Sequence, residues 1–233
     1  VFIDENEWTA YDEYGKYPID KNDFSFIKDN QKVQFEYAFI MIHGTPGEDG
    51  KLQGYFDMIG LPYNTSSAAI TSLTFQKFHC NRYLSTFGIN VAEAVLIKKG
   101  DHISQQEILD TVGLPCFVKP TDAGSSFGVT KVKDSEKLKS AIQYAFKHGK
   151  EVIAEAFISG RELTNGVYRN EEGIQILPIT EIISGNEFFD YEAKYKGQSS
   201  EVTPADISIK LEKEIKDLTY KIYNMLGMKG VAR

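Results

Sequence analysis

The chain has 233 residues, of which 42% are hydrophobic and 25% are charged, and its formal net charge is −7 at pH 7. This length allows one large domain or roughly two to three small ones, and the acidic balance argues against a general nucleic-acid binder. No apolar run reaches the about 18 residues of a transmembrane helix. The sequence opens with Val1-Phe2-Ile3-Asp4, without the charged start of a signal peptide. We therefore expect a cytoplasmic protein that binds neither nucleic acid nor membranes.

The cysteines and histidines do not indicate a disulfide or a metal site. The two cysteines, Cys80 and Cys116, lie in apolar segments far apart in the sequence. Such cysteines are typical of buried thiols in a cytosolic protein. The four histidines are scattered without the spacing of metal ligands. The sequence therefore predicts no metal ligand.

Short strands are expected in residues 1–36, because apolar runs alternate there with turn signals such as Asp20-Lys21-Asn22-Asp23. Both ends of the sequence are also strand-like. Val1-Phe2-Ile3 starts inside a strand, and Gly230-Val231-Ala232-Arg233 stops where another begins. This pattern favours an excerpt from a longer protein.

The first candidate binding residue follows a continuous apolar run. Residues 36–42 form this run, which is typical of a strand buried on both faces of a parallel sheet. The run ends in His43 and a Gly-rich stretch. His43 would then lie at the carboxyl end of a strand, where open α/β sheets bind ligands. The residues that follow predict a helix, whose buried face would consist of Leu52, Tyr55, Phe56 and Ile59.

A further helix is predicted around Lys77, which lies beside an apolar stripe near helical spacing. The stripe ends before Gly88, a typical helix terminator, and consists of Phe75, Phe78, Leu84 and Phe87. The largely apolar residues 89–97 follow, and then a polar stretch up to Val112.

A lysine followed by a Gly/Ser-rich turn marks the centre of the sequence. The run Cys116-Phe117-Val118-Lys119 leads through Gly124-Ser125-Ser126-Phe127-Gly128 into the strand-like Val129-Thr130-Lys131-Val132. Backbone N–H groups can converge on phosphate oxygens in such a turn, because glycine has no Cβ. In the Walker loop the lysine follows the glycines and a helix comes next, unlike here. We predict a hairpin that folds over a nucleotide, with Lys119 reaching the phosphates. The Gly/Ser turn alone is equally compatible with an ordinary surface hairpin.

The remaining sequence predicts a helix, several strands and a final helix. Residues 134–147 carry an amphipathic stripe, and residues 151–158 form a clear strand. A hairpin and a further strand are expected over residues 166–183, followed by a polar loop at 196–204. A long helix closed by Gly227 ends the series, and its apolar stripe consists of Leu211, Ile215, Leu218, Ile222 and Met225.

These motifs resemble, in order, those of the D-alanine–D-alanine ligases of the ATP-grasp superfamily. The resemblance covers roughly residues 40 to 233, and residues 1–36 carry no motif of their own. The five matching groups are His43-Gly44 with Gly47-Glu48-Asp49-Gly50 and Gln53-Gly54, Phe117-Val118-Lys119-Pro120 with Gly124 to Val129, Glu155 to Ile158 with Gly160-Arg161-Glu162, Tyr191 to Tyr195 with Pro204-Ala205, and Leu226-Gly227 with Gly230 to Arg233.

The resemblance implies an ATP-grasp fold, which combines α/β and α+β parts. An N-terminal open α/β domain, here incomplete, would cover residues 1–72. A small central domain with the Gly-rich hairpin flap would cover residues 73–159. A partial C-terminal antiparallel-sheet domain would cover residues 160–233, with ATP between two antiparallel sheets.

The resemblance also implies a chemistry, the ATP-dependent ligation of two D-alanine molecules through an acyl phosphate for peptidoglycan precursor synthesis. ATP and Mg²⁺ are the implied cofactors, and the Mg²⁺ ligands are expected beyond Arg233. D-Alanine and ATP are the implied partners, and a homodimer is left open.

Nucleotide-binding residues are carried over only where they match the family motifs. Lys77 and Lys119 would contact phosphates, and Glu162 would bind the ribose. Without the family, Glu162 would be interpreted as a solvated loop acid. The other implied nucleotide contacts are Ser126, Glu155, Phe157, Ile158 and Lys194.

Four further residues are implied in binding or converting the amino acids. His43 would bind substrate, and Arg233 would donate to the oxyanion of the tetrahedral intermediate. Ser125 and Tyr195 would join the flap to the loop at 196–204 and close the site against water. Tyr195 could otherwise be a packing aromatic, but its position directly after Lys194 favours the functional interpretation.

Two other interpretations stay open. A sister ligase would join D-alanine to D-serine or D-lactate. The Lys194-Tyr195 pair argues against D-lactate and less strongly against D-serine. A nucleotide-binding module of the same fold would have lost catalysis, which the presence of Lys119, Ser125 and Arg233 disfavours.

Overall fold

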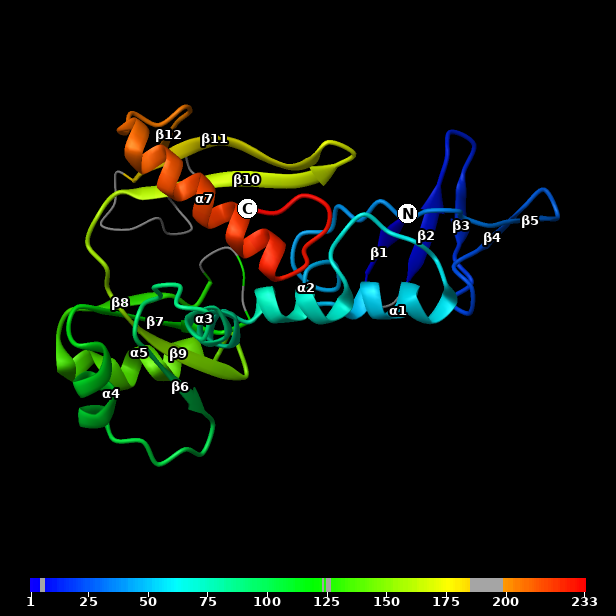
Figure 1. The fold of residues 1–233 in the computed structure, drawn as a ribbon. Helices are drawn as coiled ribbons and strands as arrows, with labels where there is room; N and C mark the ends of the chain where they lie inside the picture. Colours follow the sequence, from blue (N-terminus) through cyan, green and yellow to red (C-terminus); the bar gives the residue numbers. More distant parts are fainter. Residues whose placement is uncertain (5–6, 123, 125–126, 185–198) are drawn as a thin grey trace.

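The computed structural model describes residues 1–4, 7–122, 124, 127–184 and 199–233. Within these residues the chain forms four sheets, and all of their strand pairs are antiparallel. Figure 1 shows three groups of elements: N-terminal strands (blue), a central sheet with its helices (green), and a C-terminal sheet beside a long helix (yellow to red). No helix in the described part of the chain has the length and apolar character needed to span a membrane.

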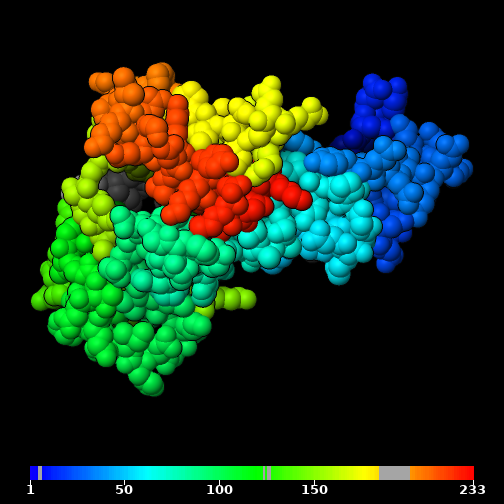
Figure 2. Space-filling view, in the orientation of Figure 1, coloured from blue at the N-terminus to red at the C-terminus, as the bar shows by residue number. Residues whose placement is uncertain are grey.

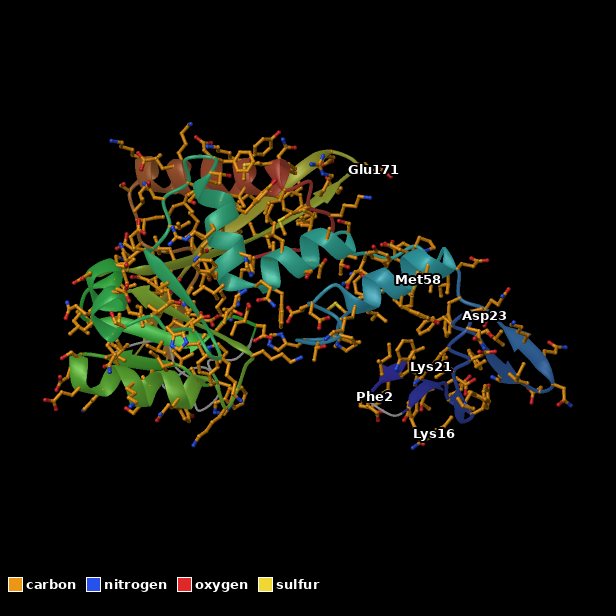
Figure 3. All side chains as sticks on the ribbon, turned by 90° about the horizontal axis from the view of Figure 1, so that it is seen from below. Phe2, Lys16, Lys21, Asp23, Met58 and Glu171 are labelled. Carbon is orange, nitrogen blue, oxygen red and sulfur yellow. The ribbon has the colours of Figure 1, made fainter. Side chains whose placement is uncertain are left out.

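Short strands build the N-terminal group, as predicted. Their aromatic side chains pack against helix α1 (Lys51–Ile59), where the Phe24 ring lies 4.9 Å from the Phe56 ring. Leu52 and Phe56 are buried on this helix, and Met58 on its outer side points to solvent (Figure 3). The strands are β1 (Phe2–Ile3), β2 (Trp8–Tyr11), β3 (Lys16–Pro18), β4 (Phe26–Lys28) and β5 (Gln31–Val33).

The strand predicted over residues 36–42 is wrong. Ala38 makes an isolated bridge to Tyr63, and Ile40 donates its N–H to the Asn64 side chain at 2.7 Å. An apolar run is buried on both faces only where neighbouring elements cover both faces. Here the described neighbours pair with the run on one side only. Ala38 and Ile40 are therefore buried, whereas the residues that alternate with them are exposed: Tyr37, Phe39 and Met41.

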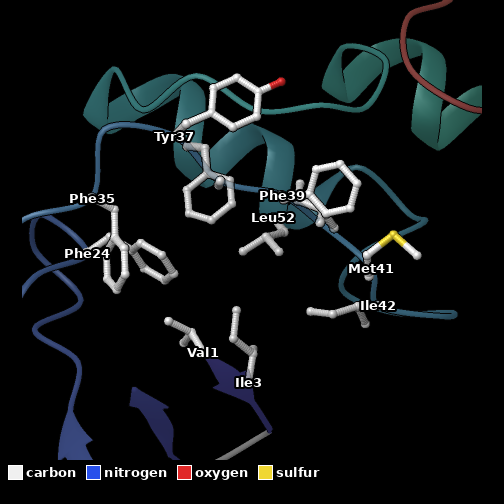
Figure 4. Close-up of a pocket in the computed structure, with 12 residues that line it drawn as sticks. Val1, Ile3, Phe24, Phe35, Tyr37, Phe39, Met41, Ile42 and Leu52 are labelled. Carbon is white, nitrogen blue, oxygen red and sulfur yellow. The ribbon is translucent and has the colours of Figure 1, made fainter. Parts of the chain in front are cut away.

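These exposed side chains border an apolar pocket of about 290 Å³. Figure 4 shows Val1 and Ile3 on one side of it and Phe39 and Leu52 on another. The lining side chains are apolar apart from the hydroxyl of Tyr37. This pocket therefore offers no charged side chain to a nucleotide or an amino acid, and the candidate site lies elsewhere.

The central sheet has the strand order β6-β9-β7-β8 and contains the predicted lysine hairpin. One face packs on α5 (Leu138–Ala145), which confirms the helix predicted there, and Val118 and Val152 are fully buried between them. Because side chains alternate along a strand, Lys119 and Glu155 lie on the other face. The strands are β6 (Ala94–Lys98), β7 (Cys116–Pro120), β8 (Thr130–Val132) and β9 (Glu151–Ala156).

The single helix predicted through Lys77 is two helices, α2 (Ala68–Phe75) and α3 (Lys77–Ser85). They are separated at Gln76, whose backbone is extended, with φ −88° and ψ 95°. The Gln76 side chain accepts a hydrogen bond from Thr121 at 2.9 Å. This contact with the residue that follows β7 accompanies the interruption of the helix.

A helix that the sequence analysis missed, α4 (Gln105–Val112), occupies the stretch described as polar. Its first turn has a reciprocal cap. The Ser104 hydroxyl accepts the Glu107 N–H at 3.1 Å, and the Glu107 carboxylate accepts the Ser104 N–H at 2.7 Å. Serine followed by glutamate three residues later is a recognised helix-start pattern, so the sequence did contain the signal.

The C-terminal sheet has the order β10-β11-β12 and lies beside the long helix α7 (Ile209–Met225) (Figure 1). The predicted hairpin is formed by β10 (Glu162–Asn170) and β11 (Gly173–Ser184), with Glu171 at its tip (Figure 3). β12 (Ser199–Val202) pairs with β11, so this part of the predicted loop at 196–204 is a strand. The domain boundaries after residues 72 and 159 stay predictions.

Both cysteines are free thiols, as predicted. Cys116 is fully buried in the central core, and Cys80 on α3 is partly buried. Burial raises the pKa of both thiols, because it disfavours the thiolate.

Replacing the cap of α4 by Ser104→Ala should lower the free energy of unfolding by about 1 kcal/mol, because the Glu107 N–H loses its acceptor. Chemical denaturation measures the change. Gln105→Ala is the matched control, since this neighbouring side chain is exposed and its loss should change stability by less than about 0.5 kcal/mol. Equal stability of the two variants would contradict a role for the cap.

Candidate active site

The register of β7 and β9 places Lys119 and Glu155 side by side on the face of the central sheet away from α5. Phe117 lies opposite Glu155, and Lys119 lies opposite Ile153. Lys119 Nζ forms an ion pair with Glu155 Oε2, and Glu155 Oε1 accepts a hydrogen bond from Asn81 Nδ2 at 3.2 Å. The two charged side chains are only 20% and 14% exposed. The sheet therefore holds a mostly buried ammonium group at a fixed position.

Lys77, the first residue of α3, is tied to the same end of β7. Its N–H donates to the Thr121 carbonyl at 3.1 Å, and its Nζ donates to the same oxygen at 3.3 Å. Thr121 is buried and directly follows Pro120, the last residue of β7. Lys77 and Lys119 thus lie near one end of the strand. Two ammonium groups near each other offer several N–H donors to an anion such as phosphate, although Glu155 offsets the charge of Lys119.

Aromatic side chains lie toward the other end of β7, where the Phe157 N–H donates to the Pro115 carbonyl. The rings of Phe117 and Phe157 are 5.9 Å apart, and Lys131 Nζ lies 4.0 Å from the centroid of the Phe157 ring. Ile158 follows and is 69% exposed, and Glu162 is exposed at the start of β10. An apolar surface that adjoins lysines suits a flat heterocycle joined to phosphates.

His43 and Arg233 lie far apart in the sequence and line one cavity of about 420 Å³. Glu48, Ser66 and Lys229 also line this cavity. His43 Nδ1 lies 3.5 Å from a Glu48 carboxylate oxygen, which also accepts the Gly44 N–H at 2.5 Å. In Figure 2 the C-terminal residues (red) pack directly against the segment that contains α2 (cyan). The cavity is lined by residues of both segments and by residues between positions 40 and 48, which include His43.

The structure thus brings together two sets of predicted site residues. Lys77, Lys119, Glu155 and Phe157 gather on the central sheet and the helix beside it. His43 and Arg233 share the cavity. Of the other predicted site residues, Ile158 and Glu162 follow β9 and are exposed. Ser125, Ser126, Lys194 and Tyr195 lie outside the described residues, and the roles of all these residues stay predictions.

Two further residues were missed by the sequence analysis. Asn81 lies one helical turn after Lys77 on α3, so the spacing of residues on one helix face could have identified it. Ser66 bonds to the backbone of Lys229, 163 residues away in the sequence. A local sequence pattern cannot indicate a contact between two residues so far apart in the sequence.

Comparison with known protein families identifies the chain. A sequence model described as the D-ala D-ala ligase C-terminus matches residues 83–233, and one described as the D-ala D-ala ligase N-terminus matches residues 4–66. The chain belongs to the D-alanine–D-alanine ligase family. The predicted family resemblance is therefore confirmed.

Curated relatives agree with this assignment. The chain is 50% identical over 218 residues to the D-alanine–D-alanine ligase of Phocaeicola vulgatus, and the match covers 94% of this chain and 67% of that protein. It is 49% identical over 234 residues to the protein of the same name from Parabacteroides distasonis, and the match covers 100% of this chain and 71% of that protein.

A solved structure supports the fold. The crystal structure of the VanG D-Ala:D-Ser ligase from Enterococcus faecalis matches with a TM-score of 0.83 and 31% sequence identity, and the match covers 97% of this chain and 71% of that one. The predicted ATP-grasp fold is confirmed by this similarity between the chain and ligases of the family.

Mg²⁺ is implied by the family, but the described residues do not fit a metal site. Among them, no group of three or more His, Cys, Asp and Glu side chains could hold an ion. At the predicted phosphate site, Lys77 and Lys119 repel a cation, and the single carboxylate of Glu155 is already paired with Lys119. The placement of the metal ligands beyond Arg233 stays a prediction.

The cavity wall should tolerate no side chain at Gly230. Gly227 and Gly230 both have positive φ, +61° and +66°, so replacing either by alanine costs about 1–2 kcal/mol in backbone strain. A Cβ at Gly230 would also lie 2.0 Å from the Asn64 carbonyl oxygen, whereas one at Gly227 would have nothing within 4 Å.

Gly230→Ala should therefore lower the free energy of unfolding clearly more than Gly227→Ala, as measured by chemical denaturation. The Gly227 variant is the control for backbone strain alone. Equal losses in the two variants would show that the contact between Gly230 and Asn64 is not tight.

Proposed function

We propose that this protein joins two D-alanine molecules to D-alanyl-D-alanine at the expense of ATP, for the synthesis of peptidoglycan precursors in the cytoplasm. Family membership and the names of the curated relatives support this reaction. The geometric observation that carries the proposal is the placement of Lys77 and Lys119 near the Thr121 end of β7, with the aromatic pair Phe117 and Phe157 toward its other end.

Lys77 and Lys119 bind the phosphates of ATP in this proposal. An ammonium group has three N–H donors, so Lys119 can keep its bond to Glu155 and still donate to a phosphate oxygen. Glu155 thus fixes the direction of Lys119, and Asn81 fixes Glu155. Phe157 and Ile158 contact the adenine, and Glu162 accepts the ribose hydroxyls. Ser126 and Lys194 are proposed as further nucleotide contacts.

The reaction has two steps. The carboxylate of the first D-alanine attacks the γ-phosphate, which gives an acyl phosphate and ADP. The amine of the second D-alanine then attacks the acyl carbon, loses a proton, and displaces phosphate. Because the attacking carboxylate and the γ-phosphate are both anions, Lys119 and Lys194 offset their repulsion.

His43 and Arg233 act on the amino-acid substrates in the proposal. The amine step creates a tetrahedral oxyanion, and Arg233 is its main side-chain donor. His43 lines the same cavity and contacts substrate. Ser125 and Tyr195 join the flap to the following loop, and this closure keeps water from the acyl phosphate.

Mg²⁺ is proposed to be held by residues beyond Arg233, where it would reduce the negative charge on the phosphates. A homodimer is proposed on the basis of the family resemblance alone.

D-Alanine–D-serine ligation is the second candidate, because a D-Ala:D-Ser ligase matches the structure at 31% identity. The curated relatives at 49% and 50% identity are D-alanine–D-alanine ligases, which favours D-alanine as the second substrate. Equal concentrations of D-alanine and D-serine in one assay, with the products separated by mass, distinguish the two. If D-alanyl-D-serine is the main product, the proposed preference for D-alanine as the second substrate is wrong.

Lys119→Ala should reduce D-alanine-dependent ADP release by at least about thirtyfold, because a charge-assisted contact in the transition state contributes roughly 2–4 kcal/mol and each 1.36 kcal/mol is about tenfold. The assay uses the complete natural chain with D-alanine and Mg-ATP. Lys139→Ala is the control, since this lysine is exposed on α5 and the change in net charge is the same. ADP release within about threefold of wild type in Lys119→Ala would contradict the phosphate role.

A further inference from the structure

The segment of residues 228–233, which carries Arg233, is attached to the rest of the molecule through its backbone. Its first attachment is to Ser66. The Ser66 hydroxyl accepts the Lys229 N–H at 3.0 Å and donates to the Lys229 carbonyl at 3.2 Å. Ser66 is only 6% exposed, and its own carbonyl accepts the Thr71 hydroxyl at 3.0 Å. One serine side chain thus satisfies both backbone groups of Lys229.

Gly230 makes the second attachment. The Tyr223 hydroxyl donates to the Gly230 carbonyl at 2.8 Å, and Tyr223 is only 1% exposed on α7. On its other side Gly230 lies against the Asn64 carbonyl, so closely that a Cβ would come within 2.0 Å. Residues 64–66 therefore touch two consecutive residues of the 228–233 segment.

Ala232 makes the third attachment. Its N–H donates to the Val167 carbonyl and its carbonyl accepts the Val167 N–H, both at 2.8 Å. Arg233 follows directly. The segment is therefore fixed between residues 64–66 on one side and β10 on the other, and the position of Arg233 depends on both.

We infer that Ser66 is a positioning residue, which sets the place of Arg233 in the cavity that Arg233 and His43 both line. The inference rests on the proposed function, in which Arg233 donates to the oxyanion. Without the Ser66 hydroxyl, both backbone groups of Lys229 lose their partner, and the segment can shift before Arg233. A misplacement of about 1 Å can cost about 100-fold in rate even when its cause lies away from the chemistry.

The test combines Ser66→Ala with Arg233→Ala in the complete natural chain. Ser66→Ala alone should lower kcat for dipeptide formation about tenfold and leave KM for ATP within about twofold of wild type, because the nucleotide residues lie on the central sheet. Ser67→Ala is the matched control. Ser67 is the exposed neighbour, and its side chain makes no cap hydrogen bond to α2, so kcat should stay within about twofold.

The double variant distinguishes positioning from general stability. If Ser66 acts through Arg233, adding Ser66→Ala to Arg233→Ala should reduce kcat by no more than about twofold, because residues that act as a unit are not additive. A full additional tenfold loss, or a wild-type kcat in Ser66→Ala, would overturn the inference. Wild-type protein without D-alanine-dependent ADP release would overturn the proposed function itself.

Tyr223→Phe keeps the test decisive if Ser66→Ala fails to fold. The ring stays packed, and only the hydroxyl that bonds to the Gly230 carbonyl is lost. The same pattern is expected: a lower kcat, an unchanged KM for ATP, and no additional loss in the Arg233→Ala background. An unchanged kcat in Tyr223→Phe would show that the attachments of the segment do not position Arg233.

Discussion

The antiparallel pairing of β7 with β9 is the constraint on which the nucleotide side of the site depends. Val118 lies opposite Ala154 in this ladder, and both face the buried core. Their neighbours Lys119 and Glu155 therefore face the other way. A slip of one residue would exchange the two faces of a strand and drive a charge into the core. Burial of apolar side chains on one face thus determines where the charged pair lies on the other.

In the proposed function, the Lys119–Glu155 pair orients a phosphate-binding lysine rather than adding stability. Removing two charges from water costs about as much as their attraction returns, so a buried ion pair is weak evidence for stabilisation. The contact of Asn81 with the second carboxylate oxygen reduces this cost. A lysine that is already oriented and partly desolvated does not have to be ordered when a phosphate arrives. Such preorganisation is the main source of electrostatic catalysis.

Much of the fold could be predicted because local patterns report buried faces. The hairpin around Lys119 and the helix α5 follow from alternation and helical spacing. The run over residues 36–42 misled the prediction, since an apolar sequence does not tell whether both faces have neighbours. Helix α4 was missed although Ser104 and Glu107 carry a capping pattern. The interruption between α2 and α3 coincides with a contact between Gln76 and Thr121, which no local pattern encodes.

The two halves of the candidate site differ in how they are built. The proposed nucleotide side lies within one sheet and an adjoining helix, and its residues were predicted from the family resemblance. The cavity side depends on segments far apart in the sequence. His43 and Arg233 were predicted from separate motifs, and only the fold shows that they share a cavity. The 228–233 segment is attached to Ser66 and to Val167. Substitutions distant from the chemistry can therefore change the cavity side of the site. On the nucleotide side, the central sheet confines the effects of such substitutions.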